Sequence, residues 1–201
     1  DMAVEICYDA KVQYPAVCNA VECILVHKNV ASKFLPLLAE RYLKAGVEIR
    51  GCDRTVEALE VFKVVRATEE DWGREYLDLK VAVRVVDDVD EAMDYINAYG
   101  SHHTDSIVTE NRNTAAKFLE GVDSSTVMHN ASTRFSDGYR YGLGAEVGIS
   151  TGKIHARGPV GLEGLVTTKY YLMGSGQVVS KYLGPNAKKF THKRLFKQWK
   201  P

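Results

Sequence analysis

Apolar and polar positions alternate along the first 130 residues in segments whose lengths fit short strands and helices. Runs rich in β-branched residues predict strands, and apolar positions at helical spacing predict the helices between them. The predicted strands cover residues 21–27, 47–49, 79–86, 106–109 and 125–129. The predicted helices cover residues 1–13, 31–45 and 56–62 (capped by Thr55). Two more begin at Asp87 or Asp88 and at Asn111 or Asn113, the latter ending near Glu120. This alternation predicts an α/β fold, in which crossover helices join the strands of a sheet.

The pattern changes after residue 137, because eight of the chain's 16 glycines fall between Gly138 and Gly164. A stretch so rich in glycine predicts a folded loop region whose backbone passes close to neighbouring groups. Residues 165–172 then predict a late strand, rich in β-formers and followed by a polar tail. Such a strand suits a sheet edge or an arm that pairs with another subunit. We therefore expect two parts, residues 1–164 and residues 165–201.

Composition is that of an ordinary globular protein: 201 residues, 45% of them hydrophobic and 26% charged. No apolar run is long enough to span a bilayer. The first residues lack the pattern of a signal peptide and resemble the middle of a helix, so we expect the natural N-terminus to lie upstream.

Net charge is zero but unevenly distributed. Seven basic residues and no acidic one lie between Ser180 and Pro201, leaving 19 basic and 26 acidic residues elsewhere. The tail lacks the interleaved aromatic residues of a nucleic-acid surface, so we interpret it as solvated or as a subunit contact, with no nucleic-acid partner. The four cysteines form no C-x-x-C pair, and no histidine cluster completes a metal set. Free thiols indicate a reducing compartment, such as the cytoplasm or the mitochondrial matrix.

Cys18 is the cysteine whose position could carry chemistry. It follows the helix break at Pro15 and precedes a predicted buried strand, a junction that can expose a side chain in a cleft. A cysteine there is nucleophilic as a thiolate, provided that its surroundings lower the pKa. The alternative is a small core residue, which is the interpretation we give to the other three cysteines.

Polar side chains also gather after the predicted strand 125–129. Ligands bind at the carboxyl ends of strands in α/β sheets, and a set of amide, hydroxyl and guanidinium groups suits an anion. The alternative is a hydrogen-bonded turn with a surface arginine. The residues concerned are Asn130, Ser132, Thr133 and Arg134.

Other candidates have weaker signals. Glu75 precedes the clearest strand and could accept hydrogen bonds from ribose hydroxyls, although the pattern alone favours a solvated charge. His155 and Arg157 end the glycine-rich stretch and could contact an anion or tie loops together. The glycines between Gly142 and Gly148 have the wrong spacing for a dinucleotide fingerprint.

Five blocks of sequence, in this order, resemble the gamma-glutamyl phosphate reductase family of the aldehyde dehydrogenase superfamily. The blocks are Val17–Glu22, Glu75–Leu79, Asn130–Gly138, Tyr141–Thr151 and His155–Leu165. The resemblance covers nearly the whole chain to about Val179. The same domain forms the C-terminal part of the bifunctional pyrroline-5-carboxylate synthase.

The resemblance implies an aldehyde-dehydrogenase-like catalytic domain over 1–164, with an oligomerisation strand and basic tail over 165–201. It implies NADPH-dependent reduction of L-glutamyl 5-phosphate to L-glutamate 5-semialdehyde through a thioester on Cys18. Glu75 would hold the nicotinamide ribose, and the substrate-binding candidates would be Asn130, Ser132, Thr133, Arg134, His155 and Arg157. The family's cofactor domain precedes the cysteine, so we expect a fragment that lacks it and is inactive alone, from an enzyme that forms homo-oligomers.

Two alternatives stay open from the sequence. The first is an aldehyde dehydrogenase that oxidises a free aldehyde with the same cysteine. The second is a non-catalytic assembly module whose sheet and edge strand build an oligomer.

Overall fold

Strand β4 (Lys80–Val86) is the centre of a four-stranded parallel sheet in this computed structural model, which describes residues 1–196. It lies between β1 (Cys23–His27) and β2 (Glu48–Gly51), and β3 (Val65–Arg66) pairs with the far side of β2. Val81, Ala82 and Val83 are at most 1% exposed although successive residues face opposite sides of the sheet. A parallel strand that is covered on both faces requires this continuous apolar run.

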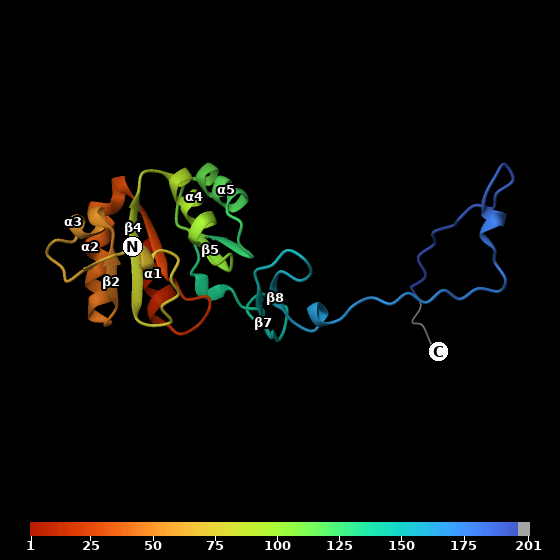
Figure 1. The fold of residues 1–201 in the computed structure, drawn as a ribbon, viewed down its shortest axis with the longest axis horizontal. Coiled ribbons are helices and arrows are strands. Elements are labelled where there is room, and N and C mark those ends of the chain that lie inside the picture. Colours follow the sequence, from red (N-terminus) through yellow and green to blue (C-terminus); the bar gives the residue numbers. More distant parts are fainter. Residues whose placement is uncertain (197–201) are drawn as a thin grey trace. The chain divides into compact units, whose positions relative to one another are not determined.

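Three helices pack with this sheet around the main core. They are α1 (Met2–Val12), α2 (Lys28–Lys44) and α3 (Asp53–Ala58). Figure 1 shows α2 and α3 beside β2 and β4, in agreement with their contacts. The core combines Leu35, Leu38 and Tyr42 of α2 with Ile49 of β2 and the valines of β4. The predicted amphipathic helices therefore bury the side that faces the sheet.

A second, smaller core lies between α4 (Val89–Tyr99), α5 (Arg112–Gly121) and the parallel strands β5 (Thr104–Ile107) and β6 (Thr126–His129). Asp88 and Asn111 cap these helices by accepting hydrogen bonds from the backbone, so the structure selects one residue from each pair of predicted candidates. The alternating strands and helices confirm the α/β class, with the parallel strands divided between two sheets.

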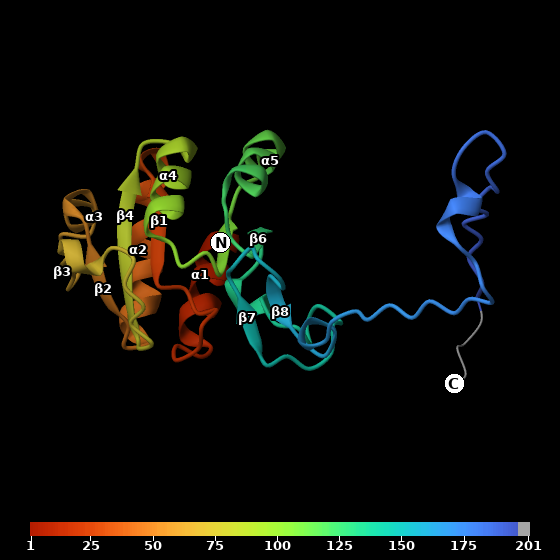
Figure 2. The same ribbon diagram turned by 45° about the vertical axis from the view of Figure 1, so that its right-hand side comes forward.

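The glycine-rich stretch forms an antiparallel pair, β7 (Gly148–Ser150) with β8 (Gly158–Val160), and Figure 2 shows the two strands side by side. The short 3-10 helix Glu163–Leu165 follows it. The glycines from 142 to 148 lead into an antiparallel strand, whereas a dinucleotide fingerprint links a parallel strand to a helix. Rejection of that motif is therefore consistent with the fold.

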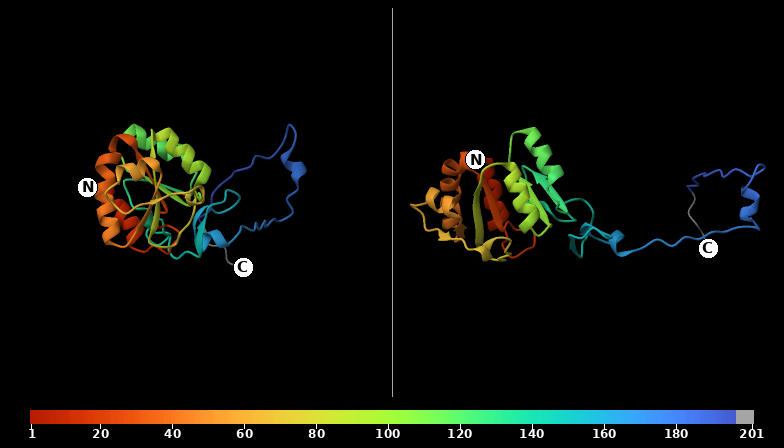
Figure 3. Two further views of the ribbon diagram at one scale, coloured as in Figure 1. Left: turned by 60° about the vertical axis from the view of Figure 1, so that its left-hand side comes forward. Right: turned by 45° about the horizontal axis from the view of Figure 1, so that its top comes forward.

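The second compact unit begins at Thr167, whereas the first is Asp1–Val166. Within it the described residues form extended chain with one 3-10 helix, Val179–Tyr182, visible in blue in Figure 3. The strand predicted over 165–172 is absent from the single chain: residue 165 ends a 3-10 helix, and residues 166–172 have no strand assignment. A strand exists only where a ladder forms, so pairing of this segment with another subunit stays a prediction. Residues 197–201 of the basic tail lie outside the described residues.

The prediction that Thr55 caps a helix over 56–62 is wrong. The helix is Asp53–Ala58 and its N-cap is Cys52. Thr55 is fully buried inside the helix, where its hydroxyl donates to the carbonyl of Val83 at 3.0 Å. A polar side chain without exposure needs such a partner, and the neighbouring strand supplies it.

Asp71 organises the loop between β3 and β4. It is 1% exposed and ends the 3-10 helix Glu69–Asp71. Its carboxylate accepts hydrogen bonds from the backbone N–H of Thr68 (2.8 Å), the hydroxyl of Tyr76 (2.8 Å) and the guanidinium of Arg50 (3.0 Å). Burial alone would raise the pKa of Asp71, but these donors lower it to about 2. Asp71 therefore folds as an anion that fixes the segment leading to β4.

We expect Asp71→Asn to lower the free energy of unfolding at pH 7 by about 2 kcal/mol, because the neutral amide loses charge-assisted hydrogen bonds. The folded-state pKa lies below the unfolded value, so this stability is present above about pH 4 and is lost as pH falls through about 2. Urea unfolding at pH 7 and near pH 2 measures the free energy of unfolding of both proteins. Equal losses on acidification in the parent and Asp71→Asn proteins would refute the role.

Candidate active site

Cys18 lies on a tight turn between α1 and β1. The turn closes by a hydrogen bond from the N–H of Ala20 to the carbonyl of Val17 (3.0 Å). The N–H of Val21 then donates to the carbonyl of Ala10 (2.9 Å), which ties the turn to the preceding helix. Cys18 is exposed, whereas Ala20 is only 7% exposed. The fold therefore presents the thiol at the end of a buried connection, as the sequence predicted.

Asn19, the next residue, is held at three points by one loop. Thr133 Oγ1 donates to its carbonyl (2.7 Å), its Nδ2 donates to the carbonyl of Ser136 (2.8 Å), and Arg134 Nη1 donates to its Oδ1. The loop contains the 3-10 helix Thr133–Phe135. Asn19 is 7% exposed, so these bonds are shielded from water. They fix the main chain on which the thiol is mounted.

A cavity of about 690 Å³, called here the Cys18 cavity, opens beside the thiol. Cys18, Glu75 and Thr133 line it, so the structure brings together three residues that lie far apart in the sequence. His103, which precedes β5, lines it as well. A concave site of this size, lined mainly by apolar residues with polar groups among them, is typical of small-molecule binding.

Glu75 is exposed in the segment before β4, and a buried ion pair holds this segment next to the cysteine turn. Lys11 is fully buried and donates to Glu22 Oε2 (2.9 Å) and to the carbonyl of Asp78 (3.1 Å). The other oxygen of Glu22 accepts from the N–H of Leu77 (3.3 Å). The segment that carries Glu75 is therefore fixed against α1 and the start of β1.

The electrostatic surroundings of Cys18 oppose ionisation. Partial burial raises the pKa of the thiol, its own backbone N–H lowers it, Glu146 and Glu75 raise it, and Arg134 lowers it, with a net increase. The N–H of Gly138 fixes Glu146 by donating to Oε2 (2.7 Å). The thiol is reachable, and a bound group must shift the balance towards the thiolate.

The other predicted substrate residues are engaged within the protein. Asn130, at a φ of 54°, accepts from the N–H of Thr109 (2.9 Å) and donates to its carbonyl (3.0 Å), joining the ends of β5 and β6. Ser132 accepts from the N–H of Arg134 (3.3 Å). Arg134 also donates to Gln13 (2.9 Å) besides Asn19. These residues shape the loop that holds the cysteine turn.

Arg157 pairs with Asp123 at 2.9 Å, and His155 is exposed in the segment before β8. Neither lines the Cys18 cavity, whose lining includes Thr133 from the loop that follows β6. Their predicted contact with the substrate stays a prediction.

Three residues of the site had no strong signal in the sequence. Asn19 adjoins the cysteine, but its partners are more than 110 residues away. Glu146 lies in a glycine-rich loop, and only the fold brings its charge near enough to raise the pKa of Cys18. His103 stands beside His102, and no sequence pattern distinguishes the two histidines. The adjacent pair was the one visible clue.

Cys52 differs from the other cysteines classed as core residues. Burial raises the pKa values of Cys7 and Cys23 to about 12. Burial acts on Cys52 too, but the Thr55 side chain and the N–H groups of Val85, Thr55 and Arg54 lower its pKa below the ordinary value. Its sulfur accepts from the N–H of Val85 at 3.4 Å.

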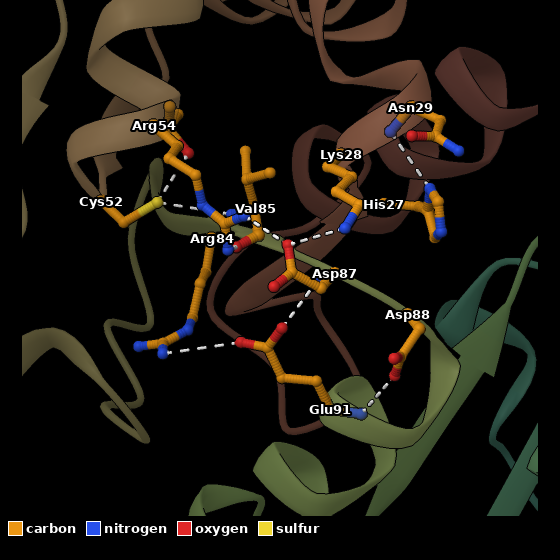
Figure 4. Close-up of polar contacts among 11 residues, drawn as sticks. His27, Lys28, Asn29, Cys52, Arg54, Arg84, Val85, Asp87, Asp88 and Glu91 are labelled. Carbon is orange, nitrogen blue, oxygen red and sulfur yellow. Dashed lines mark hydrogen bonds and ion pairs between the residues drawn. The ribbon is translucent and has the colours of Figure 1, made fainter.

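Charged side chains lie near the sulfur of Cys52. Figure 4 shows it beside Arg54, which pairs with Asp87 (2.7 Å), while Lys28 contacts the same carboxylate (3.4 Å). Hydrogen bonds to the sulfur account for the lowered pKa, and Cys52 occupies the N-cap position of α3 without a capping bond from its side chain. Among the described residues, no group of three histidine, cysteine or acidic side chains is placed to hold a metal. Within the same range, no helix is long and apolar enough to cross a membrane.

Comparison with known proteins first defines the class. No family model matches the chain. A lactaldehyde dehydrogenase structure superposes with a TM-score of 0.52 at 19% identity, over 65% of this chain and 36% of that one. At this identity the likeness establishes the fold alone. The chain therefore has an aldehyde dehydrogenase fold.

The particular family follows from closer relatives. The chain is 60% identical to the gamma-glutamyl phosphate reductase of Methanosarcina mazei, over 97% of this chain and 44% of the relative. It is 58% identical to that of Natronomonas pharaonis, over 100% and 46%. The Thermotoga maritima reductase structure superposes with a TM-score of 0.83 at 50% identity, over 88% of this chain and 42% of that one. The chain belongs to the gamma-glutamyl phosphate reductase family and spans about half the length of these relatives.

We expect Glu146→Gln to lower the pKa of Cys18, because it removes a negative charge and keeps an oxygen that can accept from Gly138. Alkylation of Cys18 by iodoacetamide at pH 7 should become a few-fold faster, and its pH–rate curve should shift to lower pH. Peptide mass mapping assigns the rate to Cys18 rather than Cys52. Glu163→Gln, at an exposed 3-10 helix, is the matched control. An unchanged curve for Glu146→Gln would disprove the electrostatic coupling.

Proposed function

We propose that this chain forms the catalytic part of an enzyme of proline biosynthesis, which reduces L-glutamyl 5-phosphate to L-glutamate 5-semialdehyde and phosphate with NADPH. The observation that carries the proposal is the exposed Cys18 on a rigid turn at a cavity shared with Glu75 and Thr133. Identity of 54–60% to curated proteins named gamma-glutamyl phosphate reductase supports this substrate class.

Cys18 supplies the nucleophile. Its thiolate attacks the acyl carbon, the bond between that carbon and the phosphate oxygen breaks, and phosphate leaves with the electron pair. Phosphate is a good leaving group, so this step needs no strong acid. After hydride addition to the thioester, the carbon–sulfur bond breaks, releasing the aldehyde and regenerating the thiolate.

The loop that follows β6 positions the nucleophile and the substrate. Thr133 lines the cavity and bonds to Asn19, so we assign it both roles. Arg134 favours the thiolate electrostatically and fixes Asn19. Asn130 and Ser132 support substrate binding by shaping the loop, because their side chains are engaged with the backbone. His155 and Arg157 would act from the segment before β8.

NADPH, when bound, supplies the hydride. Glu75 fits the ribose of such a cofactor, since it is an exposed carboxylate on the Cys18 cavity and carboxylates accept hydrogen bonds from ribose hydroxyls. We place most of the cofactor site in the part of the relatives that this chain does not span. We further propose a homo-oligomer, with residues 165–172 as the pairing strand, in a reducing compartment that keeps the thiols free.

The identity values favour the reductase over a dehydrogenase of free aldehydes, because the aldehyde dehydrogenase structures match at 19%. A non-catalytic assembly module would have no use for an exposed thiol on a rigid turn. The assay of NADPH oxidation described next distinguishes both alternatives from the reductase.

A hybrid reductase, in which this chain replaces the matching residues of the Methanosarcina mazei relative, should reduce glutamyl phosphate with NADPH. Cys18→Ala should lower kcat by at least about 10⁴-fold, because no other group forms the covalent bond. Cys52→Ala, the matched control, should retain most of the activity. NADPH oxidation at 340 nm measures both. Equal activity of the parent and Cys18→Ala would refute the mechanism.

The 201-residue chain alone should bind NADPH weakly, because Glu75 supplies one contact to the ribose and the other contacts lie elsewhere. Fluorescence titration should show no saturation at concentrations that saturate the hybrid. Saturation of both at the same concentration would contradict the placement of the cofactor site.

A further inference from the structure

His103 is a buried ring with one nitrogen unaccounted for. The residue is 7% exposed and directly precedes β5. Its Nδ1 lies 2.7 Å from Thr104 Oγ1, and its buried Nε2 has no hydrogen-bond partner among the described residues. Buried polar atoms are nearly always paired, so an orphan at a cavity marks a group that a ligand can satisfy.

The ring belongs to the same cavity as the nucleophile. His103 and Cys18 both line the Cys18 cavity. The carboxylates of Glu75 and Glu146 raise the pKa of both groups, in the same direction as burial for Cys18 and against it for His103. Both groups therefore share one cavity and the electrostatic influence of the same two acids.

The position of the hydrogen on the neutral ring makes Nε2 a hydrogen-bond donor. Burial lowers the pKa of His103 more than the carboxylates raise it, so the imidazole is neutral at pH 7. A neutral ring has one N–H and one acceptor nitrogen. The Thr104 hydroxyl can donate to Nδ1, which leaves the hydrogen on Nε2.

The cavity needs such a donor. The predicted ligand is an anion, and Glu75 and Glu146 repel anions. Arg134, the cation that acts on Cys18, is occupied by Asn19 and Gln13. A hydrogen-bond donor fixed in a low-dielectric wall stabilises negative charge without reorganisation.

We propose that His103 is a substrate-binding residue whose Nε2–H donates a hydrogen bond to an anionic oxygen of the acyl-phosphate substrate bound at Cys18. This rests on the proposed function. Two oxygens of the substrate have the required chemistry: a phosphoryl oxygen, or the oxygen of the acyl group as it becomes negative during addition to the carbon.

The reverse reaction separates these two oxygens. With NADP⁺ and glutamate 5-semialdehyde but no phosphate, the hybrid reductase should form one thioester and one NADPH per active site, seen as a burst. Added phosphate then attacks the thioester and permits turnover. The burst rate reports on the acyl oxygen, whereas phosphate-dependent turnover reports on the phosphoryl oxygen.

We expect His103→Leu to slow one of these steps by roughly ten- to hundredfold, the usual effect of losing a hydrogen bond to a charged group. A slower burst assigns the acyl oxygen, and a raised KM for phosphate with an unchanged burst assigns the phosphoryl oxygen. His103→Gln, which keeps an N–H donor, should recover part of the loss. Burst amplitude corrects each rate for the fraction of folded sites.

His102→Asn is the matched control. His102 contacts the carbonyl of Asp123 (2.7 Å), does not line the Cys18 cavity, and has a φ of 58° that asparagine tolerates. It should change neither step. Normal rates for both steps in His103→Leu would overturn the inference. Absence of a burst in the parent hybrid would instead overturn the proposed function.

A second measurement uses the unaltered 201-residue chain, so it does not depend on the folding of a variant. Titration with inorganic phosphate should shift the ¹⁵N resonance of His103 Nε2 if the phosphoryl oxygen is the acceptor, and leave it unchanged if the acyl oxygen is. A shift together with normal phosphate kinetics in His103→Leu would refute the role in the reaction.

Discussion

The hydrogen bonds that hold Asn19 are the constraint on which the site depends. Asn19 follows the nucleophile directly, and one loop satisfies its backbone carbonyl and both atoms of its side-chain amide. The site therefore arises where the turn after α1 meets the loop after β6. Because the bonds are buried, their loss would leave polar groups unpaired and would free the thiol to move.

A second polar network, built on the Lys11–Glu22 pair, holds the segment that carries Glu75 against the same helix and strand. The nucleophile and the proposed ribose acceptor are thus placed by separate polar contacts at one end of the main core. Such an arrangement preorganises the cavity, while partial burial and, to a smaller extent, the acids around Cys18 raise the pKa of the resting thiol. We infer that ligand binding, rather than the protein alone, completes activation of the thiol.

Local pattern was enough to predict most of the α/β elements, since β4 is apolar on both faces and α4 and α5 begin at capping residues. It failed where a distant partner decides the outcome. Thr55 resembles a cap but donates to Val83 in a neighbouring strand, and residues 166–172 form no ladder within one chain. In the site, Cys18 and Glu75 had local signals or a family resemblance. Asn19, Glu146 and His103 did not, because their roles depend on residues brought near by folding.

The central claim is that Cys18, rather than the more acidic Cys52, carries the acyl group. The most direct test is to quench the hybrid reductase after mixing with glutamate 5-semialdehyde and NADP⁺ without phosphate, and to map the thioester by peptide mass spectrometry. We predict one glutamyl group on the peptide that contains Cys18. A glutamyl group on the Cys52 peptide, or on neither, would contradict the account.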